Sequence, residues 1–357
     1  MSVAVGMAEA PHLDLSAYPL VAITGVQYNN PTDPRFNLSL ENASNMREAG
    51  VPLLVVDSSN PDNHESVALA HQQLGAIVEP AAIGGIATQR QQGVASAVEA
   101  GARKILSGEP EKVGLATHAA AIADALDVVD VLVIGRTPAA EDSLPPVQQR
   151  TERLAGWLLE RVFDLPADAL SGARGFTVAG AEVLADYQST MPGPDGEAVS
   201  DPKKNNWIYL YEVPLEARQR GLRIGGLALD LIHPEAMVEE ETGNPFFDNK
   251  RFDQFELQLT YLLGNWLNDE SNQNHPDRDM VAYAYNMTSL LKGTSLWFQS
   301  QVLGCMESFF ADYGFTDNEG GQHPTYSPAE RLLNLEPGDP AASRPGLKYQ
   351  SADAEIA

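Results

Sequence analysis

The chain has 357 residues, with 23 Lys plus Arg against 49 Asp plus Glu and a formal charge of −26. This length allows two domains or one large α/β domain with additions, and an apolar fraction of 43% suffices for a sizeable core. The negative field repels phosphates and no basic run interrupts it, so we expect no nucleic-acid partner and no binding to an anionic membrane.

Short β-branched runs alternate with helical segments in the first part of the chain. The predicted strands cover residues 20–24, 51–57, 76–79, 102–106 and 128–135, and the helices between them cover 38–49, 65–74, 88–100 and 113–126. The strands are apolar throughout, which is typical of a mainly parallel sheet covered by helices on both faces. Right-handed crossovers then bring the C-terminal ends of the strands to one edge, where ligands bind in such sheets.

The rest of the chain is less regular. We expect a loop at 137–146, a helix at 148–163, a tight Gly-rich turn at 171–176, a mobile lid or plain surface loop at 191–206, a helix at 207–219, a strand at 222–231 and helices at 250–267 and 280–310. This pattern predicts an N-terminal arm (1–17), one α/β domain (18–267), a helical extension (268–315) and an extended, proline-rich C-terminal arm (316–357).

Carboxylates follow two of the predicted strands. Asp57 can accept a hydrogen bond from a nucleobase or a ribose hydroxyl, or can merely begin the turn SSNPDN. Glu109 and Glu111, separated by one proline, form a short acidic corner. Such a corner supplies the hard oxygen ligands that a divalent cation prefers, but it is also common at a helix N-terminus.

One histidine and three arginines occupy comparable positions. His233, at a strand end before Pro234, is either a third metal ligand or a histidine that bonds a backbone carbonyl. Arg90, Arg136 and Arg174 lie beside glycine turns or strand ends, where a guanidinium can bind phosphate or carboxylate oxygens or form a surface ion pair.

Several common signatures are missing. No G-x-G-x-x-G, phosphate-binding loop, G-x-S-x-G, H-E-x-x-H or CxxC pair occurs. The lone Cys305 lies in an apolar stretch, so we expect a buried structural thiol. The N-terminus has no secretion-signal pattern and no run of about 18 apolar residues exists, so we expect a cytoplasmic protein without a membrane span.

The order of these pieces resembles the GT-A fold of nucleotide-sugar-dependent glycosyltransferases. LVAITG, VVDSSN, AIGGIATQRQQG and KILSGEPE stand where that fold has its first strand, an acid after the second strand, a Gly-rich loop with an Arg, and its metal-binding Asp-x-Asp motif. SGARGF and the Ile-His-Pro segment resemble the acceptor loop and the late metal-binding histidine of mannosylglycerate and glucosyl-3-phosphoglycerate synthases. The similarity covers about residues 18–265.

The resemblance implies a hexosyltransferase that uses a nucleotide-diphosphate sugar and a small acceptor, retains anomeric configuration and employs Mg²⁺ or Mn²⁺. It implies three groups of site residues: nucleotide-sugar-binding Thr24, Gly25, Asp57, Arg90 and Glu109; acceptor-binding Arg136, Gly172, Ala173 and Arg174; and metal-binding Glu109, Glu111 and His233. Arg136 would pair with an acidic acceptor. No catalytic nucleophile or base is identified.

Two other functions remain open because Glu-Pro-Glu stands in place of Asp-x-Asp. The chain could be a metal-independent transferase or a non-catalytic GT-A-like protein that assembles through its C-terminal helices, for example as a homodimer. His118 is an unassigned alternative ligand. A sugar nucleotidyltransferase is a third possibility, but the first strand exit lacks the basic Gly-rich loop used on a triphosphate.

Overall fold

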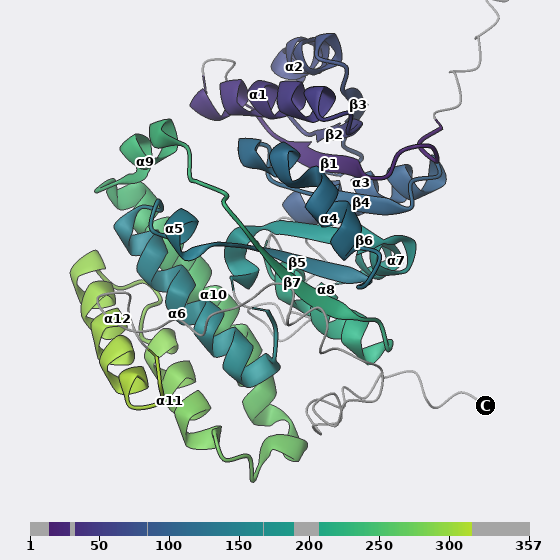
Figure 1. The fold of residues 1–357 in the computed structure, drawn as a ribbon. Helices are drawn as coiled ribbons and strands as arrows, with labels where there is room; N and C mark the ends of the chain where they lie inside the picture. Colours follow the sequence, from purple (N-terminus) through teal and green to yellow (C-terminus); the bar gives the residue numbers. More distant parts are fainter. Residues whose placement is uncertain (1–13, 29–32, 84, 167, 189–206, 316–357) are drawn as a thin grey trace, which may run out of the picture.

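The computed structural model describes residues 14–28, 33–83, 85–166, 168–188 and 207–315. Its centre is a seven-stranded sheet in the order β3-β2-β1-β4-β6-β5-β7 (Figure 1). The strands are β1 (Val21–Val26), β2 (Leu53–Asp57), β3 (Ile77–Pro80), β4 (Lys104–Ser107), β5 (Val131–Arg136), β6 (Ala173–Thr177) and β7 (Ile224–Leu229). β6 runs antiparallel to both neighbours, and the other pairs are parallel.

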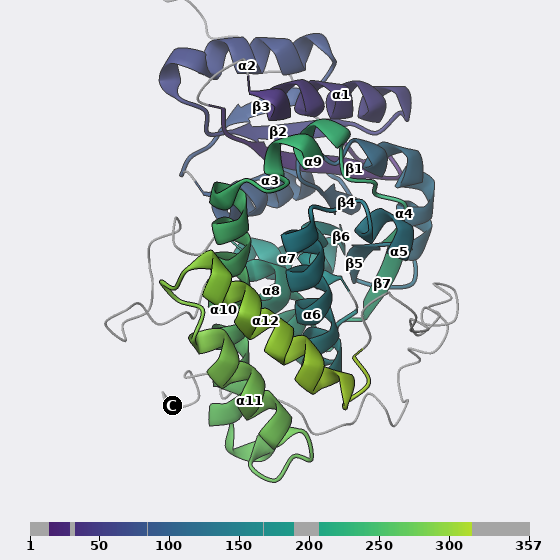
Figure 2. The same cartoon turned by 90° about the vertical axis from the view of Figure 1, so that its left-hand side faces the viewer.

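Helices lie on both faces of this sheet (Figures 1 and 2). They are α1 (Pro34–Glu48), α2 (Pro61–Gln73), α3 (Ile86–Glu99), α4 (Ala119–Ala125), α5 (Pro138–Glu141), α6 (Pro146–Phe163), α7 (Val178–Asp186), α8 (Tyr209–Gln219), α9 (Glu235–Glu241), α10 (Pro245–Asn268), α11 (Arg278–Ser289) and α12 (Leu296–Ala311). Short 3-10 turns are η1 (Val113–His118), η2 (Ala169–Ser171) and η3 (Glu270–Asn272). The expected mainly parallel α/β sheet is confirmed.

Alternate residues of the central strands enter two separate cores. In β1, Val21 and Ile23 pack into the core formed with α3, α6, α7, α8 and α10 to α12, whereas Ala22 and Val26 pack into the core formed with α1, η1 and α4. Since successive side chains of a strand point to opposite faces, a strand covered on both sides must be apolar at every position. This explains why the strand sequences lack the alternation of a half-exposed sheet.

The segment SGARGF is a strand rather than the expected tight turn. Only Gly172, with φ of 77°, adopts the left-handed conformation of a turn, and β6 begins at the next residue. Gly175 lies inside the strand, where a Cβ atom would approach the Leu132 side chain to 3.1 Å. Gly172 therefore serves a turn and Gly175 a close contact between strands. The sequence alone does not show which glycine has which role.

The predicted helical segment 280–310 is two helices, α11 and α12. The chain turns between them through Gly293, which has φ of 67°. The loop expected at 137–146 contains the short α5, and the helix expected at 113–126 begins as η1. Cys305 is exposed on α12, so the expectation of a buried thiol is wrong. Its neighbours Val302, Leu303 and Met306 occupy the buried face.

Several predictions lie outside the described residues: the lid or loop at 191–206, the C-terminal arm at 316–357 and most of the N-terminal arm. Among the helices that the structure does describe, none combines the length and apolar character needed to cross a membrane.

Candidate functional site

A pocket of about 390 Å³ opens at the C-terminal edge of the parallel strands. Its lining comes from the ends of β1, β4, β5 and β7, from η2, and from α1, α3, α6, α9 and α10. This is the edge at which ligands bind in open α/β sheets, and the volume falls within the range of small-molecule sites. The sheet topology thus brings residues from the whole chain to one cavity.

The expected nucleotide-binding residues near β1 and β2 differ in accessibility. Gly25 lines the pocket, but Thr24 and Asp57 are buried beneath it. The Thr24 hydroxyl donates to the Gly108 carbonyl at 2.9 Å. The Asp57 carboxylate accepts from the Ser59 amide at 2.8 Å and lies 2.7 Å from His64 Nδ1. Both polar groups hold protein loops in place.

Helix α3 contributes a pocket residue that the sequence did not reveal. Gln89 lines the pocket, and its side-chain amide donates to the carbonyls of Val26 and Val56, both at 2.9 Å. The predicted Arg90 lies outside the pocket lining, fully buried, and donates to the Ser107 hydroxyl at 2.7 Å. No hydrogen-bond partner for Arg90 Nε or Nη2 occurs among the residues that the structure describes.

The acidic corner after β4 lies in the pocket. Burial raises the pKa of the Glu109 carboxyl, but the charges of Lys112 and Arg90 outweigh burial and hold that pKa below its usual range. The Lys112 ammonium lies 3.2 Å from the Glu109 carboxylate. Burial, followed by the charge of Glu109, raises the pKa of Glu111. The Glu109 carboxylate is therefore paired with Lys112, whereas the environment of Glu111 disfavours its charged form.

His233 follows β7 and also lines the pocket. Its side chain is 12% exposed, and Nε2 lies 3.9 Å from a Glu241 carboxylate oxygen without a hydrogen-bond partner among the described residues. Burial, with a further contribution from the Lys112 charge, lowers the pKa of His233 to about 4. The imidazole is consequently neutral near pH 7 and offers a nitrogen lone pair.

The predicted metal ligands Glu109, Glu111 and His233 thus share one cavity. Within the described ranges, however, no three His, Cys, Asp or Glu side chains are gathered closely enough to hold a metal ion. The alternative ligand His118 lies at the end of η1, outside the pocket lining.

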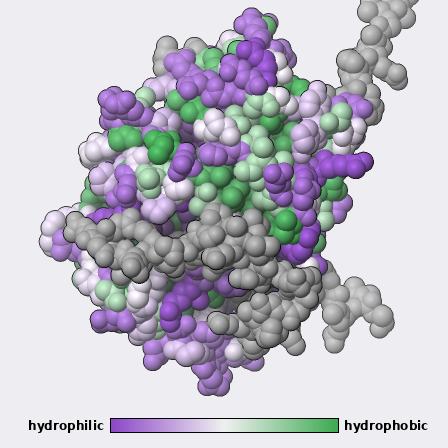
Figure 3. Space-filling model, viewed as in Figure 1, coloured by the Kyte–Doolittle hydropathy of each residue, from purple (hydrophilic) through white to green (hydrophobic). Residues whose placement is uncertain are grey.

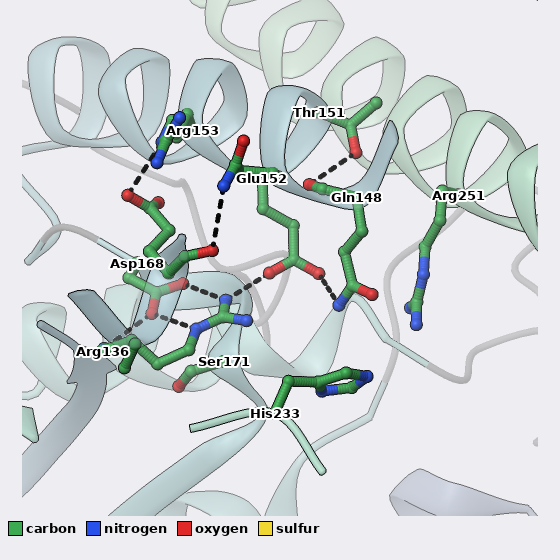
Figure 4. Close-up of polar contacts among 12 residues, drawn as sticks. Arg136, Gln148, Thr151, Glu152, Arg153, Asp168, Ser171, His233 and Arg251 are labelled. Atoms are coloured by element: carbon green, nitrogen blue, oxygen red, sulfur yellow. Dashed lines mark hydrogen bonds and ion pairs between the residues drawn. The ribbon is translucent and has the colours of Figure 1, made fainter. Parts of the chain in front are cut away.

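Arg136, at the end of β5, is held by two carboxylates of the protein (Figure 4). Asp168 accepts from Arg136 Nε at 2.8 Å and from Nη2 at 2.6 Å, while Glu152 accepts from Nη2 and from the Gln148 amide. Burial lowers the pKa of Arg136, but these carboxylates outweigh it and raise the pKa well above its usual value. The guanidinium expected to bind an acidic acceptor is already neutralised.

The segment expected to line the acceptor pocket lies at its border. Arg174 is buried within the sheet layer, where it donates to the carbonyls of Ala173 at 2.7 Å and Leu210 at 2.9 Å. Gly172, Ala173 and Arg174 lie outside the pocket lining, whereas the preceding Ser171 belongs to it. A Cβ atom on Gly172 would lie 2.8 Å from the Glu109 carboxyl group, so this turn packs directly against the acidic corner.

Basic side chains from helices complete the lining. They are Arg35 of α1, Lys112 before η1, and Lys250 and Arg251 of α10. No sequence pattern predicted Arg35, Lys250 and Arg251 as site residues, because they are distant from every strand end and belong to no motif. The polar start of the amphipathic segment at 250 was the only local signal.

No family model and no curated protein matches the chain. Solved structures do match. Glucosyl-3-phosphoglycerate synthase from Mycobacterium tuberculosis, in complex with Mn²⁺, UDP and phosphoglyceric acid, is 13% identical with a TM-score of 0.44, covering 68% of this chain and 78% of that chain. A protein from Desulfovibrio desulfuricans described as a candidate nucleotide-diphospho-sugar transferase is 11% identical with a TM-score of 0.35, covering 81% and 98%.

Proposed function

We propose that this chain is a glycosyltransferase that moves a sugar from a nucleotide-diphosphate sugar to a small acidic acceptor, with retention of anomeric configuration and assistance from a divalent cation. The observation that carries the proposal is the pocket at the strand ends, whose lining combines the carboxylates of Glu109 and Glu111 with five basic side chains. In a chain with a charge of −26, such a basic group favours an anionic ligand.

The reaction requires that negative charge growing on the departing diphosphate be stabilised. Basic groups aimed at this charge before the reaction begins stabilise the transition state without further reorganisation. The lining has basic side chains that would contribute positive charge near the phosphates, although Lys112 and Arg251 are each paired with a protein carboxylate. Gln89 and Gly25, which also line the cavity, would contact the nucleoside.

The pocket also contains donors of the kind that a divalent cation prefers. His233 is neutral near pH 7, with a buried and unpartnered Nε2 among the described residues, and Glu111 provides carboxylate oxygens. Glu109, Glu111 and His233 would hold Mg²⁺ or Mn²⁺ once their side chains move closer together than they lie in this structure. When bound, the cation would supply positive charge for the leaving diphosphate.

Calorimetric titration with UDP- and GDP-sugars, with and without Mn²⁺, tests the proposal. We expect one nucleotide to bind and its affinity to rise when Mn²⁺ is present. If no nucleotide or nucleotide sugar binds under either condition, the proposal is wrong.

The variant Glu111→Gln separates a transferase from an assembly protein. It keeps the size of the side chain but removes one negative charge from the pocket. Hydrolysis or transfer of the donor sugar should fall by at least about tenfold, whereas the exposed Glu239→Gln, on the outer side of α9, should leave it unchanged. Equal behaviour of both variants would favour the assembly protein. Pyrophosphate release from a nucleoside triphosphate and a sugar phosphate would favour the nucleotidyltransferase.

A homodimer through α11 and α12 and a cytoplasmic location stay predictions. α12 exposes Trp297 at 71%, which is large for an aromatic side chain of a monomer surface. Light scattering of the full chain and of Trp297→Glu measures whether this side chain lies in an interface.

A further inference from the structure

The pocket lining is less acidic than the chain as a whole. Acidic residues outnumber basic ones by 49 to 23 in the sequence. The pocket lining instead has five basic side chains, Arg35, Lys112, Arg136, Lys250 and Arg251, against four acidic ones, Glu109, Glu111, Glu152 and Glu241. A lining in which basic and acidic side chains are nearly balanced opposes an anionic ligand less than the strongly acidic rest of the chain does.

Four of the five basic groups are neutralised by protein carboxylates. Arg136 pairs with Asp168 and Glu152, Lys112 with Glu109 at 3.2 Å, Arg251 with Glu241 at 3.0 Å, and Arg35 with Glu240 and Glu241, both at 3.3 Å. Lys250 forms no hydrogen bond and no ion pair with any side chain or backbone group that the structure describes.

The surroundings of Lys250 compensate its charge only in part. The side chain is half-buried, and its ammonium lies 6.0 Å from the centre of the Phe247 ring. Burial, followed by the charge of Arg251, lowers the pKa of Lys250. The nearby Glu241 carboxylate is already shared by the guanidinium groups of Arg35 and Arg251.

We propose that Lys250 binds an oxyanion of a substrate, a phosphate or a carboxylate group, in this pocket. A charged ligand oxygen gives the ammonium the partner that the described protein residues do not provide. Lys250 thereby takes the role that the sequence predicted for Arg136, whose donors are occupied by Asp168 and Glu152. The inference rests on the proposed function in one respect, because it takes the oxyanion from either the donor diphosphate or the acidic acceptor.

Three variants test the role of the charge. Lys250→Gln removes it, Lys250→Arg retains it, and Lys292→Gln makes the same change in net charge at an exposed position outside the pocket. Inorganic phosphate and UDP are titrated calorimetrically into each full-length protein. We expect Lys250→Gln to weaken the binding of at least one probe by about tenfold or more, and Lys250→Arg and Lys292→Gln to stay within about threefold of the unmodified chain.

Competition between the probes identifies the source of the oxyanion. If phosphate displaces UDP, Lys250 binds the donor diphosphate; if both bind together and only phosphate depends on Lys250, it binds the acid group of the acceptor. Unchanged binding of both probes in Lys250→Gln would overturn the inference and leave the proposed function standing. Lys250-dependent phosphate binding without any nucleotide binding would overturn the proposed function and leave the oxyanion site standing.

Discussion

At the scale of single residues, Gly172 brings the turn before β6 into contact with the acidic corner at Glu109. Its φ of 77° is strained for any residue with a Cβ, and a Cβ here would also meet the Glu109 carboxyl group at 2.8 Å. Gly221 has a similar φ of 79°, but a Cβ added there would have no other atom within 4 Å. The two glycines therefore separate backbone strain from the contact with Glu109.

We expect Gly221→Ala to lower the free energy of unfolding by about 1 kcal/mol and to leave UDP binding unchanged. Gly172→Ala should lower it further, because Glu109 must move, and should weaken UDP binding. Urea unfolding and calorimetric titration of both variants provide the measurement. If both variants lose the same stability and bind UDP with the same affinity, the contact between Gly172 and Glu109 has no effect on either property.

Arg136 stabilises the fold by pairing with two buried carboxylates, a role that its position at a strand end did not predict. Arg136→Met would leave two buried carboxylates without their cation, a change that typically costs about 3–5 kcal/mol of stability. Arg223, paired with Asp130 at 3.0 Å but 43% exposed, is the matched control, and Arg223→Met should cost less than about 1 kcal/mol. Urea unfolding compares them. A stable Arg136→Met protein that lost only acceptor affinity would restore the role first expected from the sequence.

His233 makes stability depend on pH. Its pKa is about 4 in the folded protein, whereas an unfolded histidine titrates near 6.5, so the unfolded state binds the extra proton first as the pH falls. Well above pH 6.5 the imidazole is neutral in both states, and the associated stability is lost as the pH falls through 6.5 toward 4. The wild type should lose about 2–3 kcal/mol more than His233→Gln between pH 7.5 and 4.5, measured by urea unfolding. If the wild type and His233→Gln lose the same free energy of unfolding, His233 has the same pKa in the folded and unfolded states.

At the scale of elements, α12 belongs to the core that covers one face of the sheet. Phe310 is fully buried, with its ring centre 5.3 Å from that of Trp157 in α6. Phe310→Ala should therefore cost about 3–5 kcal/mol, and Trp297→Ala, exposed on the same helix, less than about 0.5 kcal/mol. Thermal unfolding followed by tryptophan fluorescence and circular dichroism should show one transition. Two transitions would indicate that the helical extension folds separately.

The sequence predicted elements well where a single physical signal dominated. Doubly covered strands such as β2 and β5 are apolar at every position, and Gly50 ends α1 in the left-handed conformation expected of a helix stop. β6 was missed because its glycines also occur in turns. The break between α11 and α12 was missed because both helices are apolar and a lone glycine inside such a run is ambiguous.

The same reasoning explains the site. Gly25, Glu109, Glu111, Arg136 and His233 line the pocket because parallel strands deliver their C-terminal ends to one edge. Proximity to that edge did not reveal which groups are already paired, as Asp57 and Arg136 are. Arg35, Lys250 and Arg251 come from helices whose approach to the edge is fixed by tertiary packing, which no local pattern encodes.

At the scale of the whole molecule, the charge of −26 is spread over a surface on which hydrophilic side chains surround scattered hydrophobic ones (Figure 3). Like charges repel more strongly in the compact state than in the expanded chain, and salt screens this repulsion over about 10 Å at 0.1 M. Raising sodium chloride from about 0.01 to 0.5 M should therefore raise the melting temperature. A fall in melting temperature would mean that favourable ion pairs outweigh the net repulsion.

The antiparallel strand β6 also constrains how the chain reaches this structure. In the described sheet, β1 to β4 form one parallel group, β5 and β7 form another, and the hydrogen bonds that join the two groups run through β6. β6 follows β4 by about 70 residues in the sequence, so its insertion closes a long loop and carries a large entropic cost. The pairing of β5 with β7 closes a longer loop still, since the chain between them runs from Arg136 to Ile224. The pocket spans both groups, so the five residues of β6 hold its two halves together.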